Sequence, residues 1–272
     1  MKPIIKYRGG KSKEIPKIIQ YIPQFDGRYI EPFLGGGAMF FHLEPNNAII
    51  NDINVRLINF YRSVQQDFMQ LSMELAELEN IYSNNRLEFD KLKKLHPEDR
   101  IPDENETLYY QLRDMYNGLI PSTYSDAALY YFINKTAFSG MIRFNAKGEY
   151  NVPYGRYKNL NTKIITEAHH ALLVNTEIHN TDYSDIFNFF MIILVIVSIL
   201  TINPDDFVFL DPPYDCIFSD YGNIQYQDGF NEENHRRLAE DFYNLGCRSL
   251  MVIGDTPLIR DLYGNNIIAE YD

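Results

Sequence analysis

The stretches GRYIEPFLGGGAMFFHL (residues 27–43) and AIINDINVRLINFYRSV (residues 48–64) repeat one pattern. Each begins with a short apolar run, passes through a turn and continues with the apolar spacing of a helix. A strand, a turn and a helix in immediate repetition are typical of βαβ units, whose strands lie parallel in one sheet. The two stretches therefore predict an α/β fold, with one strand over residues 48–51.

Beyond these units the periodicity changes twice. From about residue 59 to 128 the sequence has helical spacing with many charges, as in FMQLSMELAELENIYS (68–83). Strand signals return in LLVNTEIHNTDYSD (172–185), in DDFVFLDPPYD (205–215), where we expect a strand over 207–210, and in RSLMVIGD (248–255). The helical stretch, together with the loop from 134 to 163, therefore resembles an insertion into an α/β domain.

The composition is that of a folded protein. The chain has 272 residues, of which 45% are hydrophobic, so it can bury a substantial core. Its two cysteines, Cys216 and Cys247, lack metal-ligand spacing and, without a cleavable-looking N-terminal segment, indicate a reduced, cytoplasmic setting. The apolar run from 187 to 202 is shorter than the roughly 20 residues of a membrane-spanning helix. We assign it to the core and expect no membrane attachment.

Positive charge is confined to two stretches. The formal net charge is -12, yet residues 1–28 carry seven basic and two acidic side chains, and residues 134–163 carry six and one. Because contact with a nucleic-acid backbone depends on lysine and arginine, a polyanion would have to bind there. Ordinary solvated faces are the alternative interpretation of both stretches.

The glycines of RGGKS (residues 8–12) suggest a phosphate-binding loop. That loop has the pattern G-x-x-x-x-G-K-[ST], in which the first glycine lets the backbone curl round the anion. The first glycine would stand at position 5, which is Ile5. This excludes the phosphate loop and disfavours a nucleotide hydrolase.

The motif DPPY follows the apolar strand predicted at 207–210. Asp211 ends that strand, and the carboxyl ends of parallel strands face the ligand crevice. Pro212 and Pro213 stiffen the turn and lack N–H donors, which leaves backbone carbonyls as acceptors. A carboxylate beside such a carbonyl accepts both hydrogens of one NH₂ group, and Tyr214 offers a ring for stacking. The motif therefore indicates a site for the exocyclic amine of a planar base; a strand-ending turn with an acidic cap is the alternative.

The glycines at 35–37 follow the first strand and precede a helix. This arrangement lets a ligand approach the backbone closely near a helix N-terminus. The pattern is not G-x-G-x-x-G, because position 40 is Phe40. Asp52 ends the next strand, where a carboxylate can bind the two hydroxyls of a ribose. Together these features indicate an adenosine-containing cofactor without a required pyrophosphate.

Five motifs, in this order and spacing, resemble the Dam-like DNA adenine N6-methyltransferases of the alpha group, the D12 class, over nearly the whole chain. KYRGGK (6–11) resembles the N-terminal K-W-x-G-G-K element, EPFLGGG (31–37) the F-x-G-x-G cofactor motif, and NDIN (51–54) the acidic ribose-binding position. NKTAFSGMIRFNAKGEYNVPYGRYK (134–158) is similar to the DNA-contacting segment, and DPPY (211–214) to the catalytic motif. The resemblance implies a Rossmann-like class I methyltransferase sheet in a catalytic domain of residues 1–58 and 162–272. It also implies an inserted, mainly helical target-recognition domain at 59–161.

The resemblance also implies an activity, the site-specific transfer of a methyl group from S-adenosylmethionine to N6 of a flipped adenine in double-stranded DNA. Asp211 and the Pro212 carbonyl would hold the amino group, Pro213 would complete the turn and Tyr214 would stack on the base. Alignment supplies much of the catalysis, so neither a metal nor a covalent nucleophile is required. The cofactor-binding residues that it implies are Tyr7, Lys11, Phe33, Gly35, Gly37, Asp52, Asp182, Tyr183 and Asp211. Lys11 is expected to meet a carboxylate or nucleic acid. Asp182 and Tyr183 would contact the adenine ring of the cofactor, and an ordinary polar turn is the alternative for this pair.

In the DNA-contacting segment the side-chain chemistry suggests separate roles. The fork of Arg143 matches the O6 and N7 acceptors of guanine in the major groove. Phe138 would wedge into the duplex, while Lys135, Arg156 and Lys158 would hold phosphates. Each is alternatively a surface cation or a core aromatic. A restriction–modification or phage setting is implied, with a cognate endonuclease that acts on the same site as a further partner.

Two departures from the family pattern keep other functions open. The first is the apolar stretch at 187–202, which the family pattern lacks. The second is the end of the sequence at NNIIAEYD (265–272). Relatives continue into a final antiparallel strand, which lies between the strands that correspond here to 249–253 and 267–271. Loss of that strand would leave an unpaired edge. The alternatives are therefore a catalytically impaired DNA- or cofactor-binding module, and an amino-methyltransferase that acts on cytosine N4 or RNA.

Overall fold

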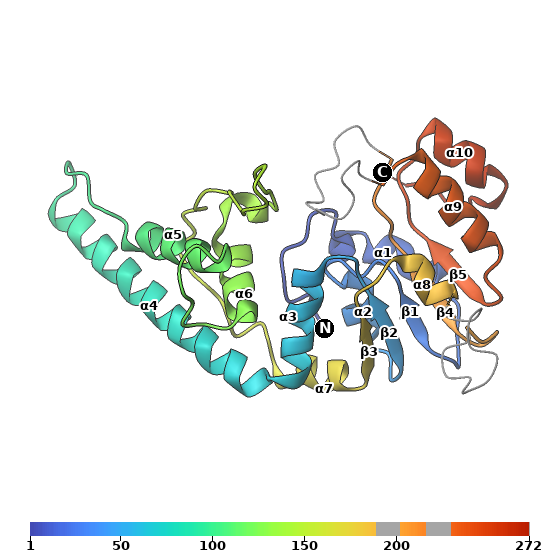
Figure 1. Cartoon of the computed structure of the whole chain (residues 1–272), viewed down its shortest axis with the longest axis horizontal. Helices are drawn as coiled ribbons and strands as arrows, with labels where there is room; N and C mark the ends of the chain where they lie inside the picture. Colours follow the sequence, from blue (N-terminus) through green and yellow to red (C-terminus); the bar gives the residue numbers. More distant parts are fainter. Residues whose placement is uncertain (189–201, 216–229, 272) are drawn as a thin grey trace. The chain divides into compact units, whose positions relative to one another are not determined.

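The computed structural model describes residues 1–188, 202–215 and 230–271 (Figure 1). The chain forms two compact units. The sheet unit comprises Met1–Lys2, Gly10–Ile58 and Asn175–Asp272, and the helical unit comprises Pro3–Gly9 and Asn59–Val174. The first nine residues are thus divided between the units.

The sheet unit contains five parallel strands. They are β1 (Tyr29–Glu31), β2 (Ala48–Asn51), β3 (Thr176–His179), β4 (Phe207–Leu210) and β5 (Arg248–Met251). Their order is β3-β2-β1-β4-β5, so the direction in which the chain adds strands reverses between β1 and β4. This arrangement confirms the predicted α/β class and both strands predicted at 48–51 and 207–210. In open parallel sheets ligands bind at the carboxyl ends of the strands, at the point of this reversal.

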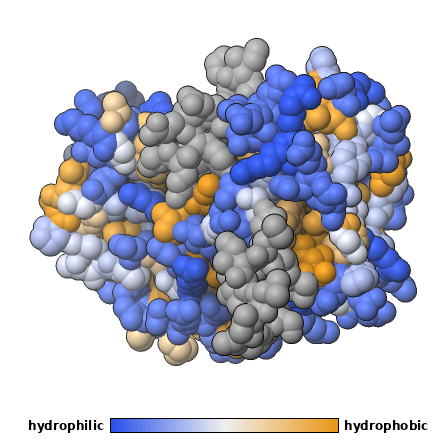
Figure 2. Space-filling view, turned by 45° about the vertical axis from the view of Figure 1, so that its right-hand side comes forward, coloured by the Kyte–Doolittle hydropathy of each residue, from blue (hydrophilic) through white to orange (hydrophobic). Residues whose placement is uncertain are grey.

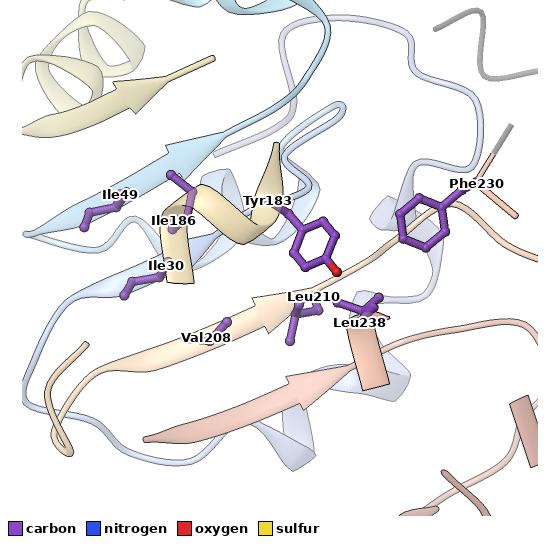
Figure 3. Packing of buried hydrophobic residues seen from close by; sticks show 8 residues of the cluster. All are labelled: Ile30, Ile49, Tyr183, Ile186, Val208, Leu210, Phe230 and Leu238. Atoms are coloured by element: carbon purple, nitrogen blue, oxygen red, sulfur yellow. The ribbon is translucent and has the colours of Figure 1, made fainter. Parts of the chain in front are cut away.

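Alternate residues of the central strands enter different cores, as the period of two in a strand requires. One core, shown in Figure 3, joins Ile30, Val208 and Leu210 of the sheet to residues of two helices, α8 (Tyr183–Asn188) and α9 (Glu232–Tyr243). Tyr29 instead meets Phe40 of α2 (Ala38–Leu43), with ring centroids 6.4 Å apart. The central strands are therefore covered on both faces, which explains why every residue of β1, β2 and β4 is buried.

Local capping chemistry explains where two helices of the sheet unit begin. α9 begins with a reciprocal capping box between Asn231 and Asn234, and Thr256 caps α10 (Pro257–Tyr263), which has proline in its first turn. The others are η1 (Lys11–Lys13), α1 (Ile15–Ile18), η2 (Ile19–Tyr21) and η4 (Gly264–Asn266).

The helical unit contains the charged, helix-periodic sequence. After α3 (Val55–Gln66), which begins in the sheet unit, come α4 (Phe68–Leu95), α5 (Glu104–Tyr116), α6 (Asp126–Thr136), η3 (Phe138–Gly140) and α7 (Glu167–Val174). Side chains of Asp103 and Ser125 cap α5 and α6. α6 is buried over most of its length, including Tyr131 and Phe132 at 0% exposure. It therefore forms the centre of this unit.

One strand prediction is wrong. Residues 267–271 form no strand in the described structure. A strand needs a ladder of backbone partners, and among the described residues β5 pairs with β4 only. The segment instead makes side-chain contacts: the Tyr271 hydroxyl donates to Glu14 Oε2 at 2.9 Å, and Lys17 lies over the Tyr271 ring.

The apolar run at 187–202 falls largely on residues 189–201, which lie outside the described residues. At its two ends, Phe187 and Ile202 pack against the core of Figure 3. No described helix is long and apolar enough to cross a membrane. The face drawn in Figure 2 is mostly hydrophilic, with hydrophobic residues in scattered patches.

Candidate active site

The carboxyl end of β4 places Asp211 beside Lys11. The ammonium of Lys11 lies 2.8 Å from Asp211 Oδ1, and the two side chains are 5% and 20% exposed. The same ammonium lies 4.6 Å from the centre of the Tyr214 ring. The structure thus assembles the predicted catalytic carboxylate, the predicted aromatic ring and the lysine of the RGGKS turn within the sheet unit.

Burial and charge act against each other in this cluster. Burial raises the pKa of Asp211 to about 6, although the Lys11 ammonium opposes the rise. For Lys11, burial lowers the pKa, but the Asp211 carboxylate and Tyr214 outweigh it and hold the pKa above its ordinary value. At neutral pH the pair is therefore a carboxylate and an ammonium. In this structure Lys11 meets the carboxylate of Asp211. A contact between Lys11 and a cofactor stays a prediction.

The rest of the DPPY turn is enclosed to different degrees. Pro212 is buried, whereas Pro213 and Tyr214 are half-buried. Tyr214 lies against Gly254, where an added Cβ would stand 3.0 Å from ring atom Cδ2. That distance is tighter than ordinary van der Waals contact, so Gly254 is a close-approach position that the sequence pattern did not single out.

The glycine turn and Asp52 meet at the ends of β1 and β2. The Gly35 N–H donates to Asp52 Oδ2 at 2.9 Å, and the Asn54 N–H donates to Oδ1 at 2.8 Å. Gly35 and Gly37 have φ of +49° and +65°, in the left-handed region that favours glycine. Burial raises the pKa of Asp52 to about 6, while the two N–H donors lower it. The predicted cofactor residues Gly35, Gly37 and Asp52 therefore form one polar turn.

A third carboxyl group lies at this edge of the sheet. Glu31 ends β1, is 2% exposed and accepts a hydrogen bond from the Tyr29 hydroxyl at 2.8 Å. Burial raises its pKa well above the ordinary value, and nearby Asp211 and Asp52 raise it further. Glu31 was not among the predicted site residues. The signal was present, because YIEP and FLDP both place an acid between an apolar strand and a proline.

The residues predicted to contact the adenine ring of the cofactor, Asp182 and Tyr183, follow β3, and Tyr183 is the first residue of α8. Asp182 accepts from Ser184 and pairs with Arg237 at 3.1 Å. Tyr183 is 1% exposed and its hydroxyl donates to Asp241 at 3.0 Å. Its ring packs on Phe33, with centroids 5.0 Å apart. Phe33 and Tyr183 are thus brought together in the core of Figure 3, and their contact with a cofactor stays a prediction.

Tyr7 lies in the helical unit, within Pro3–Gly9. This segment is tied to α6 by Asn134, which is 6% exposed. The Lys6 N–H donates to Asn134 Oδ1 at 2.8 Å, and Asn134 Nδ2 donates to the Lys6 carbonyl at 2.7 Å. The Lys6 ammonium donates to the Lys135 carbonyl at 2.9 Å. Nothing in the sequence signalled this link, because its partners stand 128 positions apart.

The predicted DNA-contacting residues differ in their surroundings. Burial, and then the Lys6 ammonium, lower the pKa of Lys135 to about 8. Phe138 is 52% exposed although its backbone N–H is bound to the Pro153 carbonyl. Arg143 donates to Asn151, Arg156 lies 3.9 Å from Glu106, and Lys158 is exposed. All five lie in the helical unit.

Metal ligation receives no support from the part of the chain that the structure describes. Among those residues no group of three or more histidine, cysteine, aspartate or glutamate side chains could hold a metal ion.

Comparison with known proteins decides the family. The family model described as "D12 class N6 adenine-specific DNA methyltransferase" matches residues 7–271. The chain belongs to this family. The match confirms the predicted adenine-specific DNA methyltransferase activity and disfavours cytosine N4 as the target.

Similar proteins agree with this assignment. The chain is 36% identical to the Type II methyltransferase M.CviBI of Paramecium bursaria Chlorella virus NC1A, over all of this chain and 90% of the relative. It is 31% identical to the Type II methyltransferase M.MjaIII of Methanocaldococcus jannaschii, over 97% of this chain and 87% of the relative. It is 26% identical to a DNA adenine methylase of Salmonella typhi, over 95% and 83%.

Proposed function

We propose that this D12-class methyltransferase uses S-adenosylmethionine to methylate N6 of an adenine that is rotated out of double-stranded DNA, with DPPY at residues 211–214 as the catalytic motif. The observation that carries the proposal is the partly buried cluster of Asp211, Lys11 and Tyr214 at the end of β4. It combines a carboxylate acceptor with an aromatic ring at the edge of the sheet where ligands bind.

The residues at the ends of β1 and β2 fit an adenosine-containing methyl donor. Asp52 is held by the Gly35 and Asn54 amides, so its carboxylate is fixed and suited to ribose hydroxyls. The left-handed glycines leave the turn without Cβ atoms where a ligand would approach. When bound, the sulfonium supplies a methyl group that is already reactive toward an amine. Tyr7, Lys11, Phe33, Asp182 and Tyr183 are the remaining cofactor-binding proposals.

The catalytic residues would act on the amino group of the target base. Asp211 and the Pro212 carbonyl would each accept one N–H of N6 and so direct the nitrogen lone pair, while the Tyr214 ring would stack on the base. An incoming NH₂ group would replace the Lys11 ammonium as the donor to Asp211. The carboxylate would therefore have a hydrogen-bond partner both before and after the base arrives, which lowers the cost of its burial.

Target recognition is proposed for the inserted region at 59–161. Its support is the exposed Phe138 and the local excess of basic side chains. Lys135, Arg156 and Lys158 would hold phosphates, and Arg143 would read guanine. A cytoplasmic location and a cognate restriction endonuclease are further proposals, the second suggested by relatives named Type II methyltransferases.

The proposal is tested with tritiated S-adenosylmethionine and unmethylated double-stranded DNA, followed by digestion and identification of the labelled nucleoside. We expect N6-methyladenine from the parent chain and from Asp205→Asn, an exposed carboxylate on the preceding turn. Asp211→Asn should lose transfer by at least about 100-fold while it keeps its circular dichroism spectrum. Full transfer by Asp211→Asn would remove DPPY from the mechanism, and cofactor binding without transfer by the parent chain would identify a silent binding module.

A further inference from the structure

One edge of the Arg143 guanidinium is held by a single residue. Arg143 Nε donates to Asn151 Oδ1 at 2.8 Å, and Nη2 donates to the Asn151 carbonyl at 3.1 Å. The Asn151 N–H in turn donates to the Arg143 carbonyl at 3.1 Å. Both side chain and backbone of Arg143 are thus bound to Asn151, although Arg143 itself is exposed.

Asn151 is fixed to the interior of the helical unit by its neighbours. Tyr150, 4% exposed, exchanges two hydrogen bonds with Asn117, at 2.8 and 3.0 Å. Val152 is 0% exposed and its carbonyl accepts from the Tyr109 hydroxyl at 2.8 Å. An exposed arginine is therefore attached to a residue whose two neighbours are held by the core.

The geometry leaves one particular edge of the guanidinium available. A guanidinium has two edges that can donate two parallel hydrogen bonds, one from Nε and Nη2 and one from Nη1 and Nη2. Asn151 occupies the first. Among the residues that the structure describes, Nη1 has no hydrogen-bond partner. The second edge has the spacing that matches O6 and N7 of guanine.

We infer that Asn151 is a positioning residue for sequence readout, which holds the inner edge of Arg143 so that its Nη1–Nη2 edge is presented to a base. The inference rests on the proposed role of Arg143. Because the arginine is ordered before DNA binds, less side-chain entropy is lost when the base contact forms. The enzyme gains this smaller entropy loss only at sites where the correct base accepts the two hydrogen bonds. The effect of Asn151 is therefore a larger difference in kcat/KM between the preferred site and sites with another base at that position.

The test compares Asn151→Ala with Asn151→Asp, which keeps an acceptor oxygen in place, and with Lys147→Ala, which removes an exposed cation from the same loop. Each purified enzyme methylates unmethylated genomic DNA, and single-molecule sequencing gives the methylated sites. kcat/KM is then measured on duplexes with the preferred site and with single-base changes. The double variant with Arg143→Ala completes the cycle, and circular dichroism and thermal melting report folding.

We expect Asn151→Ala to reduce discrimination at one base position by about three- to tenfold, the size of one immobilised side chain. Asn151→Asp should keep the base preference but bind DNA more weakly. Lys147→Ala should change the affinity for DNA without changing the base preference. In the Arg143→Ala background, Asn151→Ala should cause no further loss. An effect of Asn151→Ala that persists there, or an unchanged preference in a folded Asn151→Ala enzyme, would overturn the inference and leave the proposed function intact. If Arg143→Ala itself keeps the parent preference, the proposed role of Arg143 fails, and the inference with it.

Discussion

At the scale of single residues, the site joins three carboxyl groups to one buried cation. Asp211, Asp52 and Glu31 stand at the ends of β4, β2 and β1, and Lys11 pairs with Asp211. Like charges that share a buried region raise one another's pKa, whereas a nearby cation lowers it. Asp211 is the one of the three that pairs with Lys11, and its charged form is the form that accepts hydrogen bonds from an amino group.

The pKa of Asp211, about 6, predicts a pH limb in methyl transfer. The carboxylate accepts N–H bonds when it is ionised, so kcat/KM should fall about tenfold per pH unit below 6 and be level above it. Lys11→Met removes the cation that lowers the pKa, and the midpoint should move upward by about one pH unit. Values of kcat/KM for the DNA substrate across pH 5 to 8, with saturating cofactor, measure both midpoints. An identical pH profile for the two enzymes would show that the ionisation of Asp211 does not cause the fall in kcat/KM.

Glu31 predicts a stability effect with a defined sign. Its folded-state pKa is raised, so its stabilising contribution is complete below the unfolded-state pKa and is lost as pH rises toward the folded-state pKa. Glu31→Gln keeps the shape and an acceptor for Tyr29 without that loss. The free energy of unfolding in urea should be higher for Glu31→Gln than for the parent at pH 8, with a smaller difference at pH 5. A variant that is less stable at pH 8 than at pH 5, relative to the parent, would contradict this assignment.

At the scale of elements, the side-chain amides of three asparagines hold distant segments in place by hydrogen bonds to their backbone. Asn51, Asn117 and Asn134 each exchange two hydrogen bonds with the backbone of one distant residue, as a neighbouring strand would. They fix segments that bear predicted functional residues: the turn after β3, the loop of Arg143 and the N-terminal segment that contains Tyr7. Loops that carry function need such anchors, because they lack ladders of their own.

Asn134→Ala should release Pro3–Gly9 from α6. Both lost hydrogen bonds are at least partly buried, so we expect a loss of about 1–3 kcal/mol in the free energy of unfolding. Trypsin should also cleave after Lys6 and Arg8 sooner than in the parent, as mass spectrometry of timed digests would show. Asn80→Ala, at an exposed position of α4, is the control. Equal cleavage rates in the two variants would show that Asn134 does not hold the segment.

At the scale of the whole molecule, charge is separated along the chain. The net charge is -12, yet residues 134–163 carry six basic side chains and one acid. The helical unit includes this stretch and also Pro3–Gly9, which holds Lys6 and Arg8. An acidic protein can bind DNA in this way, because the contact depends on local cations and the remaining surface limits non-specific binding.

Salt dependence tests which cations touch phosphate. Lys135→Ala, Arg156→Ala and Lys158→Ala should each weaken DNA binding at all sequences and reduce the slope of log affinity against log salt by about one. Lys91→Ala, an exposed cation of α4 outside the basic stretches, should leave the slope unchanged. Fluorescence anisotropy from 50 to 300 mM NaCl measures both. A slope that is unchanged in one of the three variants would remove that residue from the phosphate contacts.

The sequence by itself determined the parallel α/β sheet, the strands at 48–51 and 207–210, and the DPPY turn. These follow from local rules, because apolar runs of strand length, glycine turns and acids at strand ends are patterns of neighbouring residues. The family, too, could be predicted from the order of five short motifs. The strand expected at 267–271 failed because pairing depends on a partner strand, which a single segment does not specify.

Only the tertiary structure decided which groups meet. Lys11 and Asp211 stand 200 positions apart in the sequence, Lys6 and Asn134 128 apart, and neither pair has a periodicity that marks it. Burial also had to be seen in three dimensions, since it raises the pKa of Asp211 and Glu31 and lowers that of Lys135. The chemical groups of the site could therefore be predicted from the sequence. Their charges, partners and orientation were decided by the packing of distant segments, because both desolvation and hydrogen bonding depend on neighbours in space.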